Sequence, residues 1–87
     1  MIKKYNIEIK RSAEKEIKKL NKSELKRVLK KIDDLSTNPK GHDSIKLSNK
    51  NEYRVRVGKY RILYEILDQT FTIVVVKVGH RKNVYDF

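Results

Sequence analysis

Arginine, histidine and tyrosine side chains gather in the C-terminal part of this 87-residue sequence, in a pattern that is typical of an anion-binding site. The candidates are Arg54, Arg56, Arg61, His80, Arg81 and Tyr85. The guanidinium group of arginine is planar and matches the oxygens of a phosphate, whereas lysine presents a hydrated point charge. Arginine is concentrated in the second half of the chain and lysine in the first. The specific anion site is therefore expected in the C-terminal half.

The first three of these residues are expected on one face of a β-hairpin, the arginine face. Alternating residues from 53 to 57 and from 60 to 66 predict two strands, and Gly58 opens a two-residue turn that suits a type II′ hairpin. This turn pairs Arg56 with Arg61. Like charges opposite each other destabilise a sheet by a few tenths to about 1 kcal/mol, which an anion between the guanidinium groups would offset. The alternative is that the arginines point into solvent and only blunt the sheet.

The other face of this hairpin is expected to be core. It carries Tyr53, Val55, Val57, Tyr60, Ile62 and Tyr64. A third strand over residues 71–78 is apolar on both faces, so the pattern leaves its register open. Either Ile73, Val75 and Lys77 or Thr72, Val74 and Val76 lie on the arginine face.

Two helices are expected before the hairpin. Apolar residues at helical spacing predict a helix that Ser12 caps and that runs to about Leu20, and a second helix that Ser23 caps and that ends before Pro39. The apolar stripe of the second helix consists of Leu25, Val28, Leu29, Ile32 and Leu35. An alternating segment at residues 2–9 adds an N-terminal strand. This order predicts an α+β fold: an N-terminal strand, a helical hairpin and then a three-stranded antiparallel sheet.

The composition limits the classes of function. The chain has 22 Lys plus Arg against 11 Asp plus Glu, a formal net charge of +11, and no Cys. We expect a single domain over residues 1–87, no disulfide, no metal site and no cofactor. We also expect no membrane span, because no apolar run reaches about 18–20 residues, and a cytoplasmic location, because the N-terminus lacks the apolar stretch of a signal peptide. The charge favours phosphate-rich or acidic partners.

Two stretches of the sequence resemble the RelE/ParE superfamily of bacterial and archaeal toxins of toxin–antitoxin systems. They are Tyr53-Arg-Val-Arg-Val-Gly-Lys-Tyr-Arg-Ile-Leu-Tyr64 and Val76-Lys-Val-Gly-His-Arg-Lys-Asn-Val-Tyr85. The resemblance implies a RelE-like fold and a ribosome-dependent endoribonuclease that cleaves mRNA in the ribosomal A site. It also implies two partners: the ribosome with its mRNA, and a cognate antitoxin, a small acidic protein that binds the toxin in a hetero-oligomer.

The resemblance also implies roles for individual residues. In RNA cleavage without a metal, the 2′-OH attacks the adjacent phosphorus, which leaves a 2′,3′-cyclic phosphate and a 5′-OH. Charge that develops on the phosphate oxygens would be stabilised by Arg56, Arg61 and Arg81. Arg54 would hold a flanking phosphate. Further contacts to RNA phosphates are assigned to Lys59, Lys77 and Lys82.

The proton acceptor is the open part of this mechanism. Well-known ribonuclease members have lysines where this sequence has Arg54 and Arg56, and arginine effectively cannot give up its proton. Tyr85 could act as the base with its pKa lowered by neighbouring guanidinium groups, and His80 titrates near neutral pH unaided. His42, in the predicted loop before the hairpin, is a weaker candidate.

Three other functions are compatible with the sequence. A ParE-type toxin would poison DNA gyrase by binding it, without ribonuclease activity. A non-catalytic basic module would bind nucleic acid in a salt-sensitive and sequence-indifferent way. A degenerate toxin would persist only in complex with its antitoxin. The hairpin arginines and the ending with His80, Arg81 and Tyr85 favour the ribonuclease.

Overall fold

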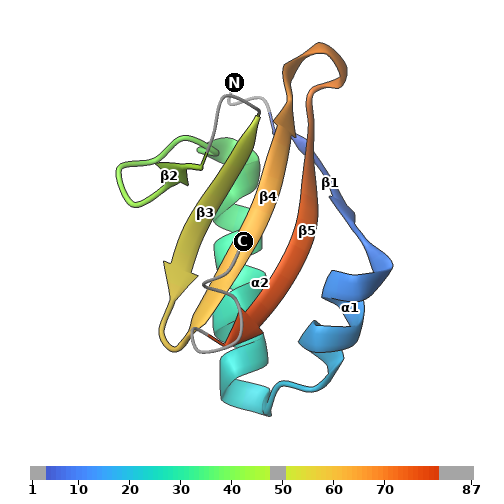
Figure 1. Cartoon of the computed structure of the whole chain (residues 1–87), viewed down its shortest axis with the longest axis vertical. Helices are drawn as coiled ribbons and strands as arrows, with labels where there is room; N and C mark the ends of the chain where they lie inside the picture. The colour runs from blue at the N-terminus through green and yellow to red at the C-terminus, as the bar shows by residue number, and fades with distance from the viewer. Residues whose placement is uncertain (1–3, 48–50, 81–87) are drawn as a thin grey trace.

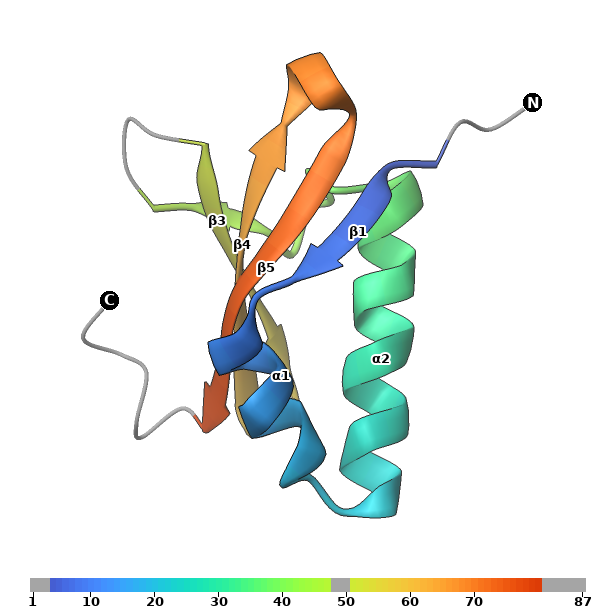
Figure 2. The same cartoon turned by 90° about the vertical axis from the view of Figure 1, so that its right-hand side faces the viewer.

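The computed structural model describes residues 4–47 and 51–80. A five-stranded sheet carries both helices on one of its faces (Figure 1 and Figure 2). In chain order the elements are β1 (Asn6–Ile9), α1 (Arg11–Lys18), α2 (Lys22–Thr37), β2 (Ile45–Lys46), β3 (Glu52–Val57), β4 (Tyr60–Leu67), the 3₁₀ turn η1 (Asp68–Thr70) and β5 (Thr72–His80). The predicted α+β class and the order of the main elements are confirmed.

The sheet is wider than the predicted three-stranded one. Its order is β1-β5-β4-β3-β2, with β1 parallel to β5 and the other neighbours antiparallel. The N-terminal strand joins the sheet because Ile7 and Ile9 lie beside Ile73 and Val75 and pack against the core. At the opposite edge, β2 pairs with the first part of β3, and its two residues extend the sheet there.

The helix starts differ from the sequence prediction. Asn21, and not Ser23, caps α2, because the Asn21 side chain accepts a hydrogen bond from the Glu24 N–H at 2.9 Å. Asparagine is among the best N-cap residues. Ser12 lies inside α1, and its hydroxyl donates to the Val76 carbonyl at 3.2 Å. No helix in the described ranges is long and apolar enough to cross a membrane.

The core lies between the helices and the sheet. The buried apolar side chains of α1 and α2 are Ala13, Ile17, Val28, Ile32 and Leu35. The sheet face against them carries Val55, Ile62, Tyr64, Ile66, Ile73, Val75 and Val78, with Tyr53, Val57 and Tyr60 partly buried beside these. The predicted core face of the hairpin is therefore confirmed. Leu29, predicted to lie in the apolar stripe of α2, is instead 44% exposed, since α2 meets the sheet along positions 28, 32 and 35.

A β-bulge decides which residues of β5 lie on the arginine face. Leu63 pairs with Lys77 and Tyr64 pairs with Val75, so Val76 is an extra residue on β5. The bulge shifts the alternation of β5 by one residue. Neither predicted register is therefore correct along the whole strand. The residues of β5 on the arginine face are Thr72, Val74, Lys77 and Gly79.

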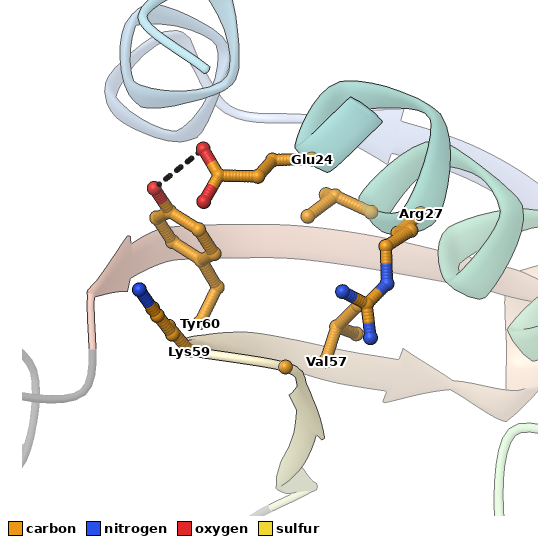
Figure 3. A pocket seen from close by; sticks show the side chains of 7 residues that line it. Glu24, Arg27, Val57, Lys59 and Tyr60 are labelled. Carbon is orange, nitrogen blue, oxygen red and sulfur yellow. Dashed lines mark hydrogen bonds between the residues drawn. The ribbon is translucent and has the colours of Figure 1, made fainter. Parts of the chain in front are cut away.

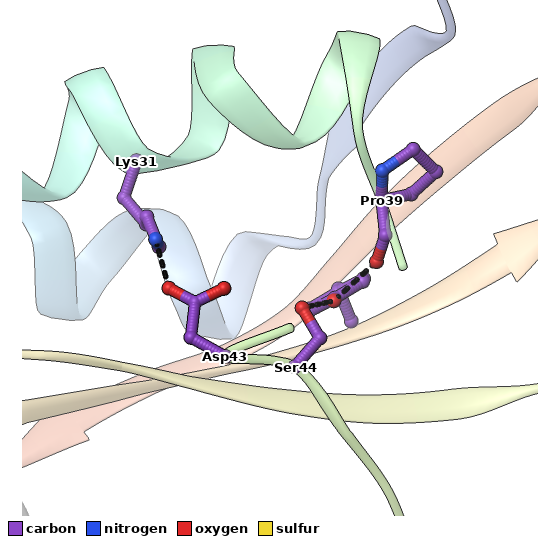
Figure 4. Close-up of polar contacts among 5 residues, drawn as sticks. Lys31, Pro39, Asp43 and Ser44 are labelled. Atoms are coloured by element: carbon purple, nitrogen blue, oxygen red, sulfur yellow. Dashed lines mark hydrogen bonds and ion pairs between the residues drawn. The ribbon is translucent and has the colours of Figure 1, made fainter. Parts of the chain in front are cut away.

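The loop after α2 is anchored at two points (Figure 4). The buried Tyr64 hydroxyl donates to the Pro39 carbonyl at 2.6 Å and is hydrogen-bonded to Ser44 Oγ at 2.7 Å. Asp43 forms an ion pair with Lys31 of α2. The hydrogen bond from Lys31 holds the pKa of Asp43 below its ordinary value of 3.8. The two contacts tie the loop to β4 and to α2.

Asp43→Asn should lower the free energy of unfolding at pH 7 by about 0.5–1 kcal/mol, as for other partly exposed ion pairs. Because the folded pKa of Asp43 is depressed, the carboxylate stabilises the fold above pH 3.8 and loses this contribution as the pH falls through its lower folded pKa. Urea unfolding of both chains at pH 7 and at about pH 2 measures the difference. Asp33→Asn, which changes an exposed carboxylate of α2, is the control and should not lower stability. A deficit for Asp43→Asn that is the same at both pH values would exclude the ion pair as its source.

Candidate anion-binding site

Three arginines share the sheet face opposite the core. Arg54 and Arg56 come from β3 and Arg61 from β4, and Arg56 lies directly opposite Arg61, as predicted. Arg56 is exposed, Arg54 is half-buried, and Arg61 is only 9% exposed. The Arg54 Nε is buried and donates no hydrogen bond within the described residues. The arginine face thus carries arginine residues from two adjacent strands.

Strand β5 adds a fourth cation to this face. Lys77 lies opposite Leu63, and Gly79 lies opposite Arg61. Because glycine has no side chain, β5 contributes only backbone beside Arg61. The bulge at Val76 is what turns Lys77 toward the arginines, since regular alternation from Val75 would place it on the core face.

His80 lies on the core side of the sheet. It pairs across the strands with Tyr60, and the two ring centroids are 5.7 Å apart with an interplanar angle of 76°. Tyr60 in turn donates to Glu24 Oε1 of α2 at 3.0 Å (Figure 3). Alternation along β5 causes this placement, because Gly79 takes the position on the arginine face. The structure therefore separates His80 from the arginines with which the sequence grouped it.

Tyr60 remains a hydrogen-bond donor at neutral pH. Desolvation, together with the Glu24 carboxylate that accepts its hydrogen bond, raises the pKa of Tyr60 above its ordinary value of 10.0. Lys59 is exposed in the β3–β4 turn and lines the same small pocket as Glu24 and Tyr60 (Figure 3). This pocket lies at the helix side of the hairpin, so Lys59 is directed to a different surface from Lys77.

The remaining predicted site residues are placed as follows. Arg81, Lys82 and Tyr85 lie outside the described residues, and their assigned roles stay predictions. His42 is exposed in the loop after α2. Among residues 4–47 and 51–80, no group of three or more His, Cys, Asp or Glu side chains could hold a metal ion.

A groove that the sequence did not predict runs beside the arginine face. It lies between α2 and the end of β3, has a volume of about 320 Å³, and is lined by Arg27, Lys30, Lys31, Asp34, Arg56, Val57 and Gly58. We call it the edge groove. Arg56 belongs to both surfaces, so the edge groove continues the arginine face. The one sequence signal for it is Arg27, an arginine in a helix whose other cations are lysines.

Arg56→Thr should raise the free energy of unfolding by a few tenths to about 1 kcal/mol, because it removes the like charge opposite Arg61. Salt screens exposed charges, so the gain should shrink at high ionic strength. Urea unfolding at low and high salt measures both effects. Lys46→Thr, in the exposed edge strand β2, is the matched control and should show no such gain. Lower stability for Arg56→Thr at low salt would contradict repulsion between the two arginines.

Comparison with known proteins identifies the class of protein to which this chain belongs. The family model of the ParE toxin of the type II toxin–antitoxin system parDE matches residues 7–85. A Methanocaldococcus jannaschii protein assigned as toxin RelE1 is 36% identical over 86 residues, which cover 94% of this chain and 96% of that one. The toxin–antitoxin complex RelBE2 of Mycobacterium tuberculosis contains a chain with 28% identity and a TM-score of 0.80, covering 93% of this chain and 95% of that chain. The RelB–RelE complex of Methanococcus jannaschii gives 32% identity and a TM-score of 0.72, with 91% and 95% covered.

Two helices packed on one side of a small sheet are thus a fold that this chain shares with the toxin chains of these two complexes. The chain belongs to the ParE toxin family of type II toxin–antitoxin systems, within that superfamily. The predicted superfamily is confirmed. The family model carries the ParE name and the relatives carry the RelE name. The choice between mRNA cleavage, expected of a RelE-type toxin, and poisoning of DNA gyrase, expected of a ParE-type toxin, therefore depends on the chemistry of the site.

Proposed function

We propose that this toxin is a ribosome-dependent endoribonuclease that cleaves mRNA. The observation that carries the proposal is the pairing of Arg56 with Arg61 on adjacent strands, with Lys77 on the same face. Like charges in this position destabilise a sheet, and an anion held between them offsets the repulsion. A phosphodiester fits this role, because guanidinium groups can donate two parallel hydrogen bonds to phosphate oxygens.

The proposed reaction breaks one bond of the RNA backbone. The 2′-oxygen attacks phosphorus, the bond from phosphorus to the 5′-oxygen breaks, and the products are a 2′,3′-cyclic phosphate and a 5′-OH. Negative charge develops on the phosphate oxygens, where preorganised cations act most strongly. Arg61, buried on the central strand, and Arg56 supply these cations, and Arg81 is assigned the same role. The residues assigned to flanking phosphates are Arg54, Lys77 and Lys82, whereas Lys59, on the helix side of the hairpin, is no longer included.

The 2′-OH must give its proton to a base, and the leaving 5′-oxygen must take up a proton from an acid or from water to become the 5′-OH. The position of His80 beside Tyr60, on the core side of the sheet, favours Tyr85 as the base. Guanidinium groups near Tyr85 would lower the pKa of its hydroxyl. The ribosome would fix the mRNA in the geometry for attack, and orientation alone can supply several kcal/mol.

Two partners follow from this proposal. One is the ribosome with mRNA in its A site. The other is a cognate antitoxin, since the relatives from Mycobacterium tuberculosis and Methanococcus jannaschii were crystallised as toxin–antitoxin complexes. A net charge of +11 favours a small acidic antitoxin, which would form a hetero-oligomer with this chain. The proposed location is the cytoplasm, where translating ribosomes are found.

Primer extension on translated mRNA from cells that express the chain tests the proposed activity. The expected result is a set of new 5′ ends inside coding regions, which are absent from a reporter mRNA whose start codon is mutated so that ribosomes do not translate it. Intact mRNA together with double-strand DNA breaks would overturn the proposal in favour of a gyrase poison. Intact mRNA and intact DNA in growing cells would overturn it in favour of a non-catalytic nucleic-acid-binding module.

A further inference from the structure

Arg27 of α2 lies against the turn between β3 and β4. Gly58 in that turn has a φ of +57°, in the left-handed region that glycine adopts readily. A Cβ atom on Gly58 would lie 3.3 Å from Arg27 Nη1 and 3.4 Å from Nη2. The missing side chain therefore lets the guanidinium group lie close to the turn backbone, beside Val57 (Figure 3). Arg27 therefore lies against the turn at one end of the edge groove.

Most cations of the edge groove have no acidic partner among the residues that the structure describes. Within residues 4–47 and 51–80, Arg27, Lys30 and Arg56 make no ion pair and no side-chain hydrogen bond. Lys31 differs, because it is paired with Asp43. Asp34 is the one acidic side chain of the lining, and its carboxylate forms no ion pair with a described residue. The groove thus presents three cations whose donors are available to a ligand.

We propose that the edge groove binds phosphate groups of an RNA strand that continues from the arginine face. The inference rests on the proposed function, in that it takes RNA as the ligand. Arg56 lies at the junction of the two surfaces, so a single strand can contact both. An RNA strand can pass along the edge of β3 from one surface to the other, because β2 pairs only with Tyr53 and Arg54 and does not cover the edge beside Arg56.

The composition of the groove favours RNA over a protein partner. Charged side chains make up most of its lining, and Val57 is the one large apolar side chain there. A stable protein interface needs an apolar centre that is fully buried, whereas a nucleic-acid backbone is bound through Lys and Arg contacts to phosphates. The acidic antitoxin is therefore the second candidate for this groove and becomes an outcome of the test.

The test measures binding of a short, fluorescently labelled 2′-O-methyl RNA to the free toxin by anisotropy at several salt concentrations. This RNA lacks the 2′-OH, so it is not cleaved, and binding is measured apart from catalysis. Arg27→Gln should weaken binding by about 5–10-fold, because a charge-assisted contact is lost. The slope of log K against log salt should fall by about 0.7 for each phosphate contact removed. Arg27→Lys, which keeps the charge and loses the planar fork, should recover part of the affinity.

Lys26→Gln is the matched control, because Lys26 is exposed on the same helix and does not line the groove. It should change affinity by less than about twofold. Equal losses for Arg27→Gln and Lys26→Gln would overturn the proposal, since only net charge would then matter. Weaker binding of the antitoxin by Arg27→Gln, with unchanged RNA binding, would overturn it in favour of a protein-docking groove. The binding measurement does not depend on cleavage, because the 2′-O-methyl RNA cannot be cleaved. A failure of the proposed ribonuclease activity, seen by primer extension, can therefore be told apart from a failure of the proposed groove, seen by anisotropy.

Discussion

Arg61→Gln is expected to abolish the growth arrest and to lower the rate of mRNA cleavage by about 10²–10³-fold, the effect of removing one preorganised donor to a developing charge. Arg61 is on the central strand, directly opposite Arg56, and is 9% exposed. A cation held in this way needs little rearrangement when charge develops on the phosphate. Growth after induction and primer extension on a translated message measure the effect. Glutamine retains part of the buried side-chain volume, so a void is kept small.

The control for this prediction is Arg11→Gln. Arg11 is exposed at the start of α1, so the change removes the same charge from the other side of the molecule. Cells that express Arg11→Gln should still stop growing. Thermal unfolding of both variants shows whether Arg61→Gln is folded at the growth temperature. A folded Arg61→Gln chain that still cleaves mRNA at the original rate would remove Arg61 from the mechanism.

The hairpin is the part of the fold that the sequence predicted most completely. Gly58 and Lys59 fix the turn, the turn fixes the register, and the register fixes which residues share a face. All of this information is local, within a few residues of the turn. The pairing of Arg56 with Arg61 could therefore be predicted before any coordinates, and it is the observation on which the proposed activity depends.

Features that depend on distant parts of the chain were not predicted. Val76 forms a bulge whose carbonyl accepts the Ser12 hydroxyl, a contact across 64 positions of sequence. Because β5 is apolar on both faces, alternation gave no sign of the extra residue. The bulge turns Lys77 toward the arginine face, and the alternation that resumes after it places His80 on the core side. The predicted grouping of His80 with the arginines relied on proximity in sequence, which does not determine the face of a strand.

The edge groove was missed for a related reason. Arg27 lies on the polar side of an amphipathic helix, where a cation is normally only solvated. Its importance depends on Gly58, which is far away in sequence and close in space. The same glycine that allows the tight turn also leaves room for the guanidinium group. One residue thus serves both the fold and the placement of a cation, and only the structure shows the second role.

Ile62→Ala is expected to lower the free energy of unfolding by about 2–5 kcal/mol, the usual loss for a large-to-small change in a core. Ile62 is fully buried on the central strand, between Val55 of β3 and Val78 of β5. Small domains have a total stability of roughly 0.05–0.15 kcal/mol per residue. The loss is therefore a large fraction of the whole, and it should lower the unfolding midpoint in urea without a large change in the slope.

Leu29→Ala is the matched control, because Leu29 is 44% exposed on α2 and lies outside the core. This change should cost less than about 0.5 kcal/mol, and Ile62→Val should cost about 0.5–1.5 kcal/mol. Similar losses for Ile62→Ala and Leu29→Ala would contradict the described packing of the helices on β4. The difference in unfolding free energy between the Ile62 and Leu29 variants also bears on the candidate site. Arg61 is the chain neighbour of Ile62 and points to the opposite face of the sheet. Packing on the core side of β4 therefore fixes the backbone that carries Arg61, the residue proposed to stabilise the developing charge on the phosphate.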